Sequence, residues 1–209
     1  TAYEIPKRDW SSDVCSSDLD EGRFRTSVSV IIPARNEENN IGPCVESLIN
    51  QNYPTDLFEV LVINDHSEDK TAEIVEDFNR RNVRLVELKE HIGDTTINSY
   101  KKKAIEVGVF LAHGELIVTT DADCITSPNW LRTIVNYYEQ EKPDLIAMPV
   151  SLLPKNSFLS LFETLDFLTL QGITAAAVST QHFNLGNGAN LAYAKSSFVK
   201  AGAFEGVDT

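Results

Sequence analysis

Short apolar runs alternate along the chain with segments whose apolar residues recur at helical spacing. The β-branched run at 28–32 and the apolar run at 58–63 predict two buried strands. Pro33 cannot donate a ladder hydrogen bond, so we expect the first strand to close there. Between the strands, helical spacing predicts a helix that ends near Gln51, with Pro43 in its first turn.

The same alternation continues to residue 150. It predicts further strands at 84–88, 116–120 and 145–150, and helices around 74–78, at 102–112 and at 130–138. Continuous apolar strands that alternate with amphipathic helices are typical of an α/β fold, with a mostly parallel sheet covered by helices on both faces. Ligands of such sheets bind beyond the carboxyl ends of the strands, so candidate chemistry is sought there.

Two segments lie outside this pattern. Residues 1–26 show no periodicity and contain a polar near-repeat at 11–19, so we expect a disordered tail or a sequencing artefact. The folded domain is expected to span 27–209. Residues 151–180 form an apolar stretch interrupted by acidic residues, which predicts a helix that covers the core; the alternative is an interfacial helix that touches a membrane.

Composition narrows the classes of partner and compartment. The formal charge of −13 disfavours nucleic acid, although a bound cation and a few basic residues could still admit a small anion to one cleft. Three widely separated cysteines indicate neither a disulfide framework nor a zinc cluster, and they fit a reducing compartment. Apolar runs stay below the roughly 18 residues of a membrane span, and the first residues lack the apolar core of a secretory signal.

The loop from Pro33 to Glu38 follows the first strand and leads into a helix. Its backbone N–H groups and Arg35 could meet an anion at the helix amino terminus. The alternative is a solvated loop whose only task is helix capping by Asn39 or Asn40.

The segment from Asn64 to Thr71 follows the second strand and places the Asp65 carboxylate at the strand tip. Such a carboxylate can accept hydrogen bonds from a nucleobase or a ribose. Ser67 and Asp69 are equally well explained as caps of the following helix.

Asp121 and Asp123 follow the strand predicted at 116–120 and are separated by one residue. Mg²⁺ and Mn²⁺ take oxygen ligands, and magnesium sites often use one or two protein carboxylates beside water and substrate phosphates. The pair therefore predicts a divalent cation site; the alternative is a turn in which an aspartate caps the helix before Trp130.

Two further segments carry weaker signals. The triplet Lys101, Lys102 and Lys103 opens a predicted helix, and one of these amines could reach a phosphate. The Gly- and Asn-rich segment at 185–191 lets a backbone approach a ligand closely, or forms an ordinary hairpin turn. Dinucleotide-binding, Walker and serine-hydrolase motifs are absent from the sequence, and the histidines lack metal-type spacing.

Taken in order, four motifs resemble glycosyltransferase family 2. They lie at 30–37, 62–71, 114–123 and 188–204, within a match that runs from about Ser27 to Gly206. The resemblance implies a GT-A (Rossmann-like) fold, a nucleoside-diphosphate sugar donor with uridine as the expected base, Mg²⁺ or Mn²⁺, and inversion at the anomeric carbon.

The resemblance also implies roles for individual residues. The implied donor-binding residues are Pro33, Arg35, Glu37, Asp65, Lys101 or Lys102, and Asp121; the metal ligand is Asp123; the acceptor-side residues are Gly188, Ala189 and Asn190. In the family a carboxylate beyond the acceptor-side segment acts as the general base, so we expect the base beyond Thr209 and the domain to be incomplete at its carboxyl terminus.

The sequence departs from the family pattern in two places. Asn64 stands where a second aspartate is commoner, and no Gln-x-x-Arg-Trp motif is present. Donor binding is therefore a firmer expectation than turnover, and a nucleotide-sugar-binding or scaffolding module is the alternative. A sugar-phosphate nucleotidyltransferase is a further alternative, but the loop at 33–38 lacks the glycines such an enzyme needs.

The expected acceptor is a saccharide or a lipid-linked saccharide, as in the synthesis of a cell-envelope polysaccharide. The expected location is the cytoplasm, at the inner face of the membrane in a full-length parent whose missing parts would carry any membrane contact.

Overall fold

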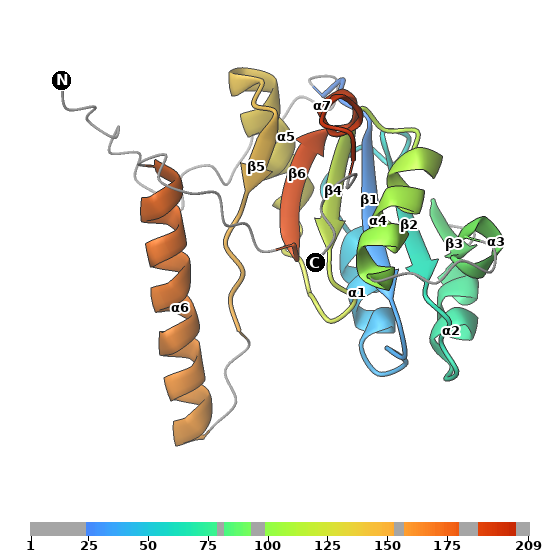
Figure 1. Cartoon of the computed structure of the whole chain (residues 1–209), viewed down its shortest axis with the longest axis horizontal. Helices are drawn as coiled ribbons and strands as arrows, with labels where there is room; N and C mark the ends of the chain where they lie inside the picture. The colour runs from blue at the N-terminus through green and yellow to red at the C-terminus, as the bar shows by residue number, and fades with distance from the viewer. Residues whose placement is uncertain (1–23, 79–81, 93–98, 153–156, 180–187, 204–209) are drawn as a thin grey trace.

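The computed structural model describes residues 24–78, 82–92, 99–152, 157–179 and 188–203. In these residues six strands form one mixed sheet with the order β3-β2-β1-β4-β6-β5 (Figure 1). The strands are β1 Val28–Ala34, β2 Phe58–Asn64, β3 Val83–Glu87, β4 Leu116–Thr120, β5 Leu145–Ala147 and β6 Asn190–Ala194. The first four run parallel, whereas β6 is antiparallel to both β4 and β5.

Helices cover both faces of this sheet, which confirms the predicted α/β fold. The helices are α1 Ile41–Ile49, α2 Thr71–Phe78, α3 Lys89–Ile92, α4 Tyr100–Leu111, α5 Trp130–Glu141, α6 Phe158–Ser179 and α7 Lys195–Lys200. Side chains of α1, α2 and α5 share one hydrophobic cluster with the sheet. Those of α4, with α7 at its margin, share the cluster on the opposite face.

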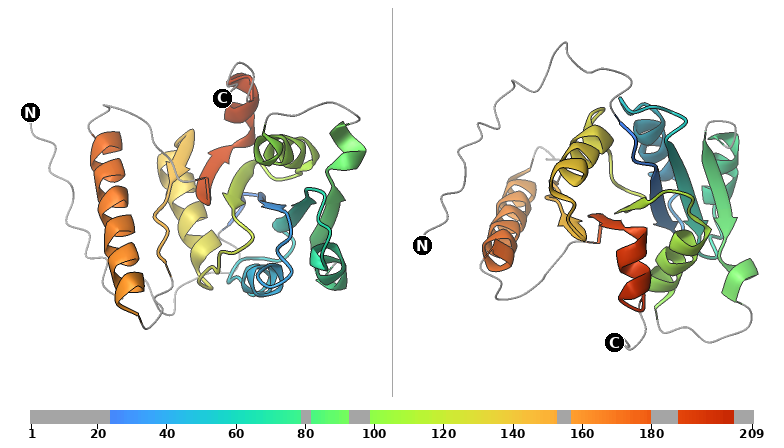
Figure 2. Two further views of the ribbon diagram at one scale, coloured as in Figure 1. Left: turned by 60° about the horizontal axis from the view of Figure 1, so that its bottom comes forward. Right: turned by 90° about the horizontal axis from the view of Figure 1, so that it is seen from above.

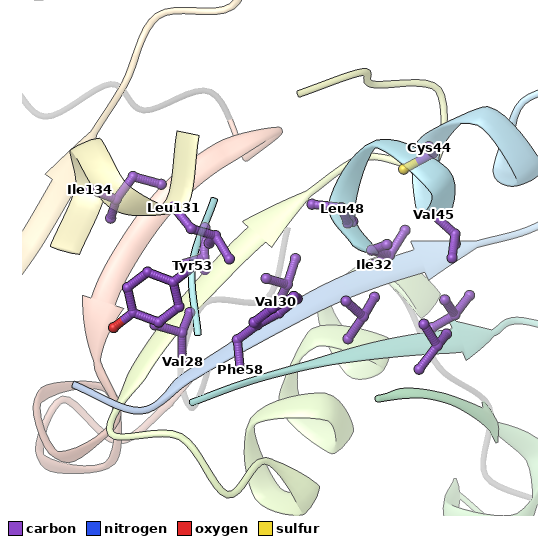
Figure 3. Close-up of a cluster of buried hydrophobic side chains, with 14 of the residues drawn as sticks. Val28, Val30, Ile32, Cys44, Val45, Leu48, Tyr53, Phe58, Leu131 and Ile134 are labelled. Atoms are coloured by element: carbon purple, nitrogen blue, oxygen red, sulfur yellow. The ribbon is translucent and has the colours of Figure 1, made fainter. Parts of the chain in front are cut away.

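The alternation of side chains along β1 places the core on both faces. Val28, Val30 and Ile32 are buried against α1 and α5 (Figure 3), and Ile31 is buried against α4. Burial of each such side chain contributes about 1.5–3 kcal/mol. Gly108 lets α4 approach this closely, because a Cβ there would lie 2.6 Å from Cγ2 of Ile31. The strand tips that carry the candidate residues therefore rest on a rigid base.

Two predicted strand ends were wrong, and one strand was not predicted. β1 continues through Pro33 to Ala34, because its pairing with β4 ends at Ile31 and the missing Pro33 N–H faces no ladder partner there. The strand predicted at 145–150 ends at Ala147. Strand β6 was not predicted, and it separates β5 from β4 by pairing with both.

The prediction that residues 151–180 cover the core was also wrong. Helix α6 stands apart from the sheet in all views (Figures 1 and 2). Its large apolar side chains point to solvent, including Phe158 at 87% and Phe162 at 62% exposure. Among the described helices, none combines the length and the apolar character that a membrane crossing requires. Of the tail expected at 1–26, residues 1–23 lie outside the described residues. Phe24 and Thr26, which that expectation included, are buried against the domain: Phe24 belongs to the hydrophobic core, and the Thr26 carbonyl accepts from Tyr53 OH at 2.6 Å.

Candidate functional site

A cavity of about 310 Å³ lies at the carboxyl ends of β1, β2 and β4. Its lining residues are Pro33, Ala34, Arg35, Glu37, Asp65, Lys101, Asp121, Ala122 and Asp123. Parallel strands end at the same edge of a sheet, so three loops distant in sequence meet here. The structure thus brings together all the predicted donor-side and metal-binding residues except Lys102, which does not line the cavity.

The loop after β1 is fastened to the loop after β2 by reciprocal hydrogen bonds. Backbone N–H groups of one loop donate to side chains of the other: Asn36 to Ser67 Oγ (3.0 Å), Glu37 to Thr71 Oγ1 (2.7 Å) and Glu38 to Asp69 Oδ2 (3.0 Å). In return, Glu68 N–H donates to Asn36 Oδ1 and Lys70 N–H donates to Glu38 Oε2. These bonds fix the two loops as one unit.

This arrangement corrects the expectation that backbone N–H groups of the first loop meet an anion. The N–H groups of Asn36, Glu37 and Glu38 already donate to the second loop, so these three are not available to an anion. The capping alternatives divide. Asp69 Oδ1 accepts the Thr71 N–H at the start of α2, whereas Asn40 makes no side-chain cap bond to α1. Asp69 is held by these donors, which lower the pKa of its carboxyl despite desolvation.

Asp65 is the buried carboxylate of the cavity, with 9% of its side chain exposed. Its Oδ1 lies 2.9 Å from His66 Nδ1, and its Oδ2 lies 3.7 Å from Arg35 Nη1. The neighbouring Asn64 has a structural role, because its side chain accepts from Ser67 N–H and donates to Glu87. One acid, Asp65, therefore faces the cavity from this strand tip.

His66 and Tyr100 also surround Asp65. Neither residue is among the site residues that the sequence predicts. The His66 and Tyr100 rings meet edge to face at 5.7 Å, and the Arg35 guanidinium lies 6.0 Å from the Tyr100 ring centre. His66 adopts a left-handed backbone conformation with φ of 54°, which turns it beside Asp65. A sequence signal existed for Tyr100 only in its place directly before Lys101.

Asp121 and Asp123 form the opposite wall of the cavity. Lys101 Nζ lies 2.6 Å from Asp121 Oδ1, while Asp123 is exposed and Ala122 between them is buried. A turn is present, since Cys124 N–H donates to the Asp121 carbonyl. Neither aspartate caps α5 as the alternative supposed.

The charge of the cavity wall favours a cation. Four carboxylates, those of Glu37, Asp65, Asp121 and Asp123, face two cationic side chains. A diphosphate alone would be repelled by this excess, whereas a divalent cation that retains water and phosphate ligands needs only one or two of these carboxylates. Among the described residues, no three or more ligating side chains gather so that they could hold a metal ion.

The predicted acceptor-side residues lie one strand away from Asp121. The Gly188 carbonyl accepts from Thr119 Oγ1, and Asn190 pairs with Thr120 across the sheet. The Asn190 side chain accepts from Trp130 Nε1 and donates to the Pro149 carbonyl. These residues therefore brace the tip of β4, and none of them lines the cavity. Residues 185–187 of the same segment lie outside the described residues.

Fold and cavity together define an α/β domain whose acidic cavity lies at the carboxyl ends of parallel strands. A family model, glycosyl transferase family 2, matches residues 29–158. The chain belongs to this family of glycosyltransferases.

Individual relatives agree with that assignment. Glycosyltransferase AglE of Haloferax volcanii is 34% identical over 119 residues, which are 57% of this chain and 38% of that protein. Staphylococcus aureus TarS 1–349, solved in complex with UDP-GlcNAc, is 27% identical with a TM-score of 0.52 over 63% of this chain and 36% of that chain. Mannosyltransferase PcManGT of Pyrobaculum calidifontis, solved with GDP-Man and Mn²⁺, shares the fold at 22% identity, with a TM-score of 0.63 over 94% of this chain and 50% of that chain. The chain thus spans well under two thirds of these relatives.

Proposed function

We propose that the cavity binds a nucleoside-diphosphate sugar, with uridine as the base, for transfer of the sugar to an acceptor hydroxyl with inversion. The observation that carries this proposal is that four carboxylates and the basic side chains of Arg35 and Lys101 meet at the ends of β1, β2 and β4. The solved complexes of TarS with UDP and with UDP-GlcNAc support the choice of uridine.

The two walls of the cavity suit the two ends of such a donor. Asp65, held between Arg35 and His66, can accept hydrogen bonds from the base or ribose. Lys101 forms an ion pair with Asp121 at the same cavity, and its amine can reach the phosphates of the donor from there. Glu37 and Pro33 also line the cavity. Asp121 is left to orient the ribose or the sugar.

Asp123 would hold Mg²⁺ or Mn²⁺. When bound there, the cation supplies Lewis-acid neutralisation of the charge that grows on the departing diphosphate. The protein contributes orientation, because the strand tips hold both aspartates beside the same cavity as Asp65 and Arg35. Family membership favours this transfer over the reaction of a nucleotidyltransferase.

The acceptor is proposed to be a saccharide or lipid-linked saccharide of a cell-envelope polymer. Support comes from the relatives: TarS of Staphylococcus aureus is a poly(ribitol-phosphate) β-N-acetylglucosaminyltransferase, and the Bacillus spizizenii relative is a poly(ribitol-phosphate) β-glucosyltransferase.

Calorimetric titration of UDP and GDP, with and without Mn²⁺, tests the donor site. We expect saturable UDP binding that requires Mn²⁺ and is lost in Asp123→Ala. Asp77→Ala is the matched control, since Asp77 is an exposed carboxylate on α2 away from the cavity. If the folded chain binds neither nucleotide under any metal condition, the donor site is refuted. Metal-dependent binding without sugar transfer, in a protein of the length of the relatives, would instead identify a binding module.

A further inference from the structure

The loop that carries Asp121 and Asp123 is held from behind by one face of α1 and the residues that follow it. Cys44, Ser47 and Gln51 recur at spacings of three and four, so their side chains project from the same side. Their contacts with the loop are Cys44 Sγ to the Asp121 carbonyl (3.6 Å), Thr126 N–H to Ser47 Oγ (3.1 Å), Gln51 Nε2 to Thr126 Oγ1 (3.1 Å) and Gln51 Nε2 to the Ser127 carbonyl (2.7 Å). Both ends of the loop are thereby fixed to α1 and to Gln51, two residues after its end.

Gln51 is the centre of these contacts. It is 7% exposed, and both ends of its amide are used. The Oε1 atom accepts the Leu131 N–H at 3.0 Å in the first turn of α5, where Asn129 makes no side-chain cap bond. A buried amide whose donors and acceptor are all engaged specifies one arrangement of the backbone around it. Its loss would leave buried backbone groups of the loop without partners.

Cys44 fixes the end of the loop nearest the carboxylates. The residue is 1% exposed, and its thiol donates to the Asp121 carbonyl at 3.6 Å. The same carbonyl accepts the Cys124 N–H, which closes the turn that contains Asp123.

This support matters because a metal site depends on the residues behind its ligands. Asp123 is exposed, so its own side chain is not packed into place. Its position relative to Asp121 is set by the backbone of the turn, and the turn is set by α1. Removal of such outer partners typically lowers metal affinity by about 10- to 100-fold.

We infer that Gln51, with Ser47, is a positioning residue for the Asp121 and Asp123 carboxylates. The inference rests on the proposed function, since the ligand whose affinity it sets is the metal-dependent donor. Gln51 touches neither ligand nor cavity, and it acts through the loop at 121–131.

Two measurements on Gln51→Met test this inference. Met keeps the length of the side chain and removes its hydrogen bonds. In the metal-free chain we expect faster hydrogen exchange in a peptide that spans 121–131. With Mn²⁺ present, we expect UDP affinity to fall about tenfold by calorimetry. Thr126→Val, which removes the hydroxyl that Gln51 and Ser47 contact, is expected to act in the same direction and serves if Gln51→Met does not fold.

The control is Val75→Ala, a fully buried truncation on α2 that lowers stability without touching the loop. It should leave the affinity for Mn²⁺ and UDP unchanged, which separates positioning from general destabilisation. Unchanged loop exchange in Gln51→Met, or faster exchange with unchanged affinity, overturns the positioning role. Failure of the native chain to bind UDP with Mn²⁺ overturns the proposed function instead, and the exchange measurement distinguishes the two because it needs no ligand.

Discussion

At each end of the parallel strands β1 to β4, a carboxylate pairs with a histidine, but the two carboxylates differ in how many hydrogen bonds they accept. At the carboxyl end, Asp65 lies 2.9 Å from His66 beside an open cavity. At the amino end, Glu59 lies 3.1 Å from His113 Nδ1 and also accepts the His113 N–H (2.6 Å) and the Ser29 hydroxyl (2.7 Å).

The difference lies in how fully each carboxylate is used. Glu59 accepts three hydrogen bonds. The Ser29 hydroxyl, which donates one of them, also accepts the Gly114 N–H at 2.8 Å. The network ties β1, β2 and the turn before β4 together. Asp65 has one close partner and one at 3.7 Å, and it faces the cavity. A saturated carboxylate stabilises the fold, whereas an incompletely used one at a cavity wall can receive a ligand.

The largest expected effect is on the closed amino end. In Gly114→Ala the new Cβ would lie 2.5 Å from the Ser29 backbone nitrogen in the central strand, which cannot move without disturbing the sheet. We expect a loss of about 3 kcal/mol in the free energy of unfolding, measured by urea denaturation. Gly172→Ala is the control, since a Cβ there meets nothing within 4 Å. Equal stability of the two variants would contradict the close packing of this end.

A substitution at the carboxyl end of the strands, where the cavity lies, should change ligand affinity rather than the stability of the fold. Asp121→Asn removes the charge that faces Lys101 and the proposed cation. We expect the affinity for UDP with Mn²⁺ to fall by roughly 10- to 100-fold, the worth of about 1.5–3 kcal/mol for hydrogen bonds to a charged group. The melting temperature should stay within a few degrees of that of the unaltered chain. Asp77→Asn is the calorimetric control, and a large stability loss in Asp121→Asn would assign the residue to the fold.

Glu59→Ala is expected to show the reverse behaviour. It removes three hydrogen bonds at the amino end and leaves the buried Ser29 hydroxyl without its acceptor. We expect a loss of about 1–2 kcal/mol in the free energy of unfolding. Nucleotide affinity of the folded variant should not change. Weakened binding in Glu59→Ala would show that the two ends are not independent.

The smallest effect is a pH dependence that belongs to the amino end. Burial raises the pKa of Glu59, but the hydrogen bonds from Ser29 and His113 outweigh it, so the pKa lies below its usual value of 4.5. A carboxyl whose pKa is lowered by folding adds stability above its unfolded pKa and loses it as the pH falls through the folded pKa. The native chain should therefore lose more stability between pH 5 and pH 3 than Glu59→Gln does, by urea denaturation at each pH. Parallel losses would contradict this role.

Much of the fold followed from local pattern. The runs at 28–32, 58–63 and 116–120 read as buried strands because both of their faces are covered, and the structure confirms them. Strand β6 could not be predicted in the same way. Its residues Asn190 to Ala194 become a strand by antiparallel pairing with β4, a contact between residues 70 to 78 positions apart. Helix α6 was correctly predicted to be a helix but wrongly placed over the core. Its apolar composition does not determine which surface its side chains contact.

For the site, the sequence by itself determined which chemical groups exist. Arg35, Asp65, Asp121 and Asp123 were predicted because polar residues directly after buried parallel strands must share one edge of the sheet. The roles given to them as donor and metal ligands, and the general base expected beyond Thr209, stay predictions.

Only the tertiary structure decided which of those groups lie together. It placed Lys101 and not Lys102 in the cavity lining, brought His66 and Tyr100 to Asp65, and placed Gln51 behind the loop that carries Asp123. Sequence spacing fixes the order of side chains along one element. Hydrogen bonds between loops and the packing of a helix against a distant turn depend on distances that arise only when the sheet has formed.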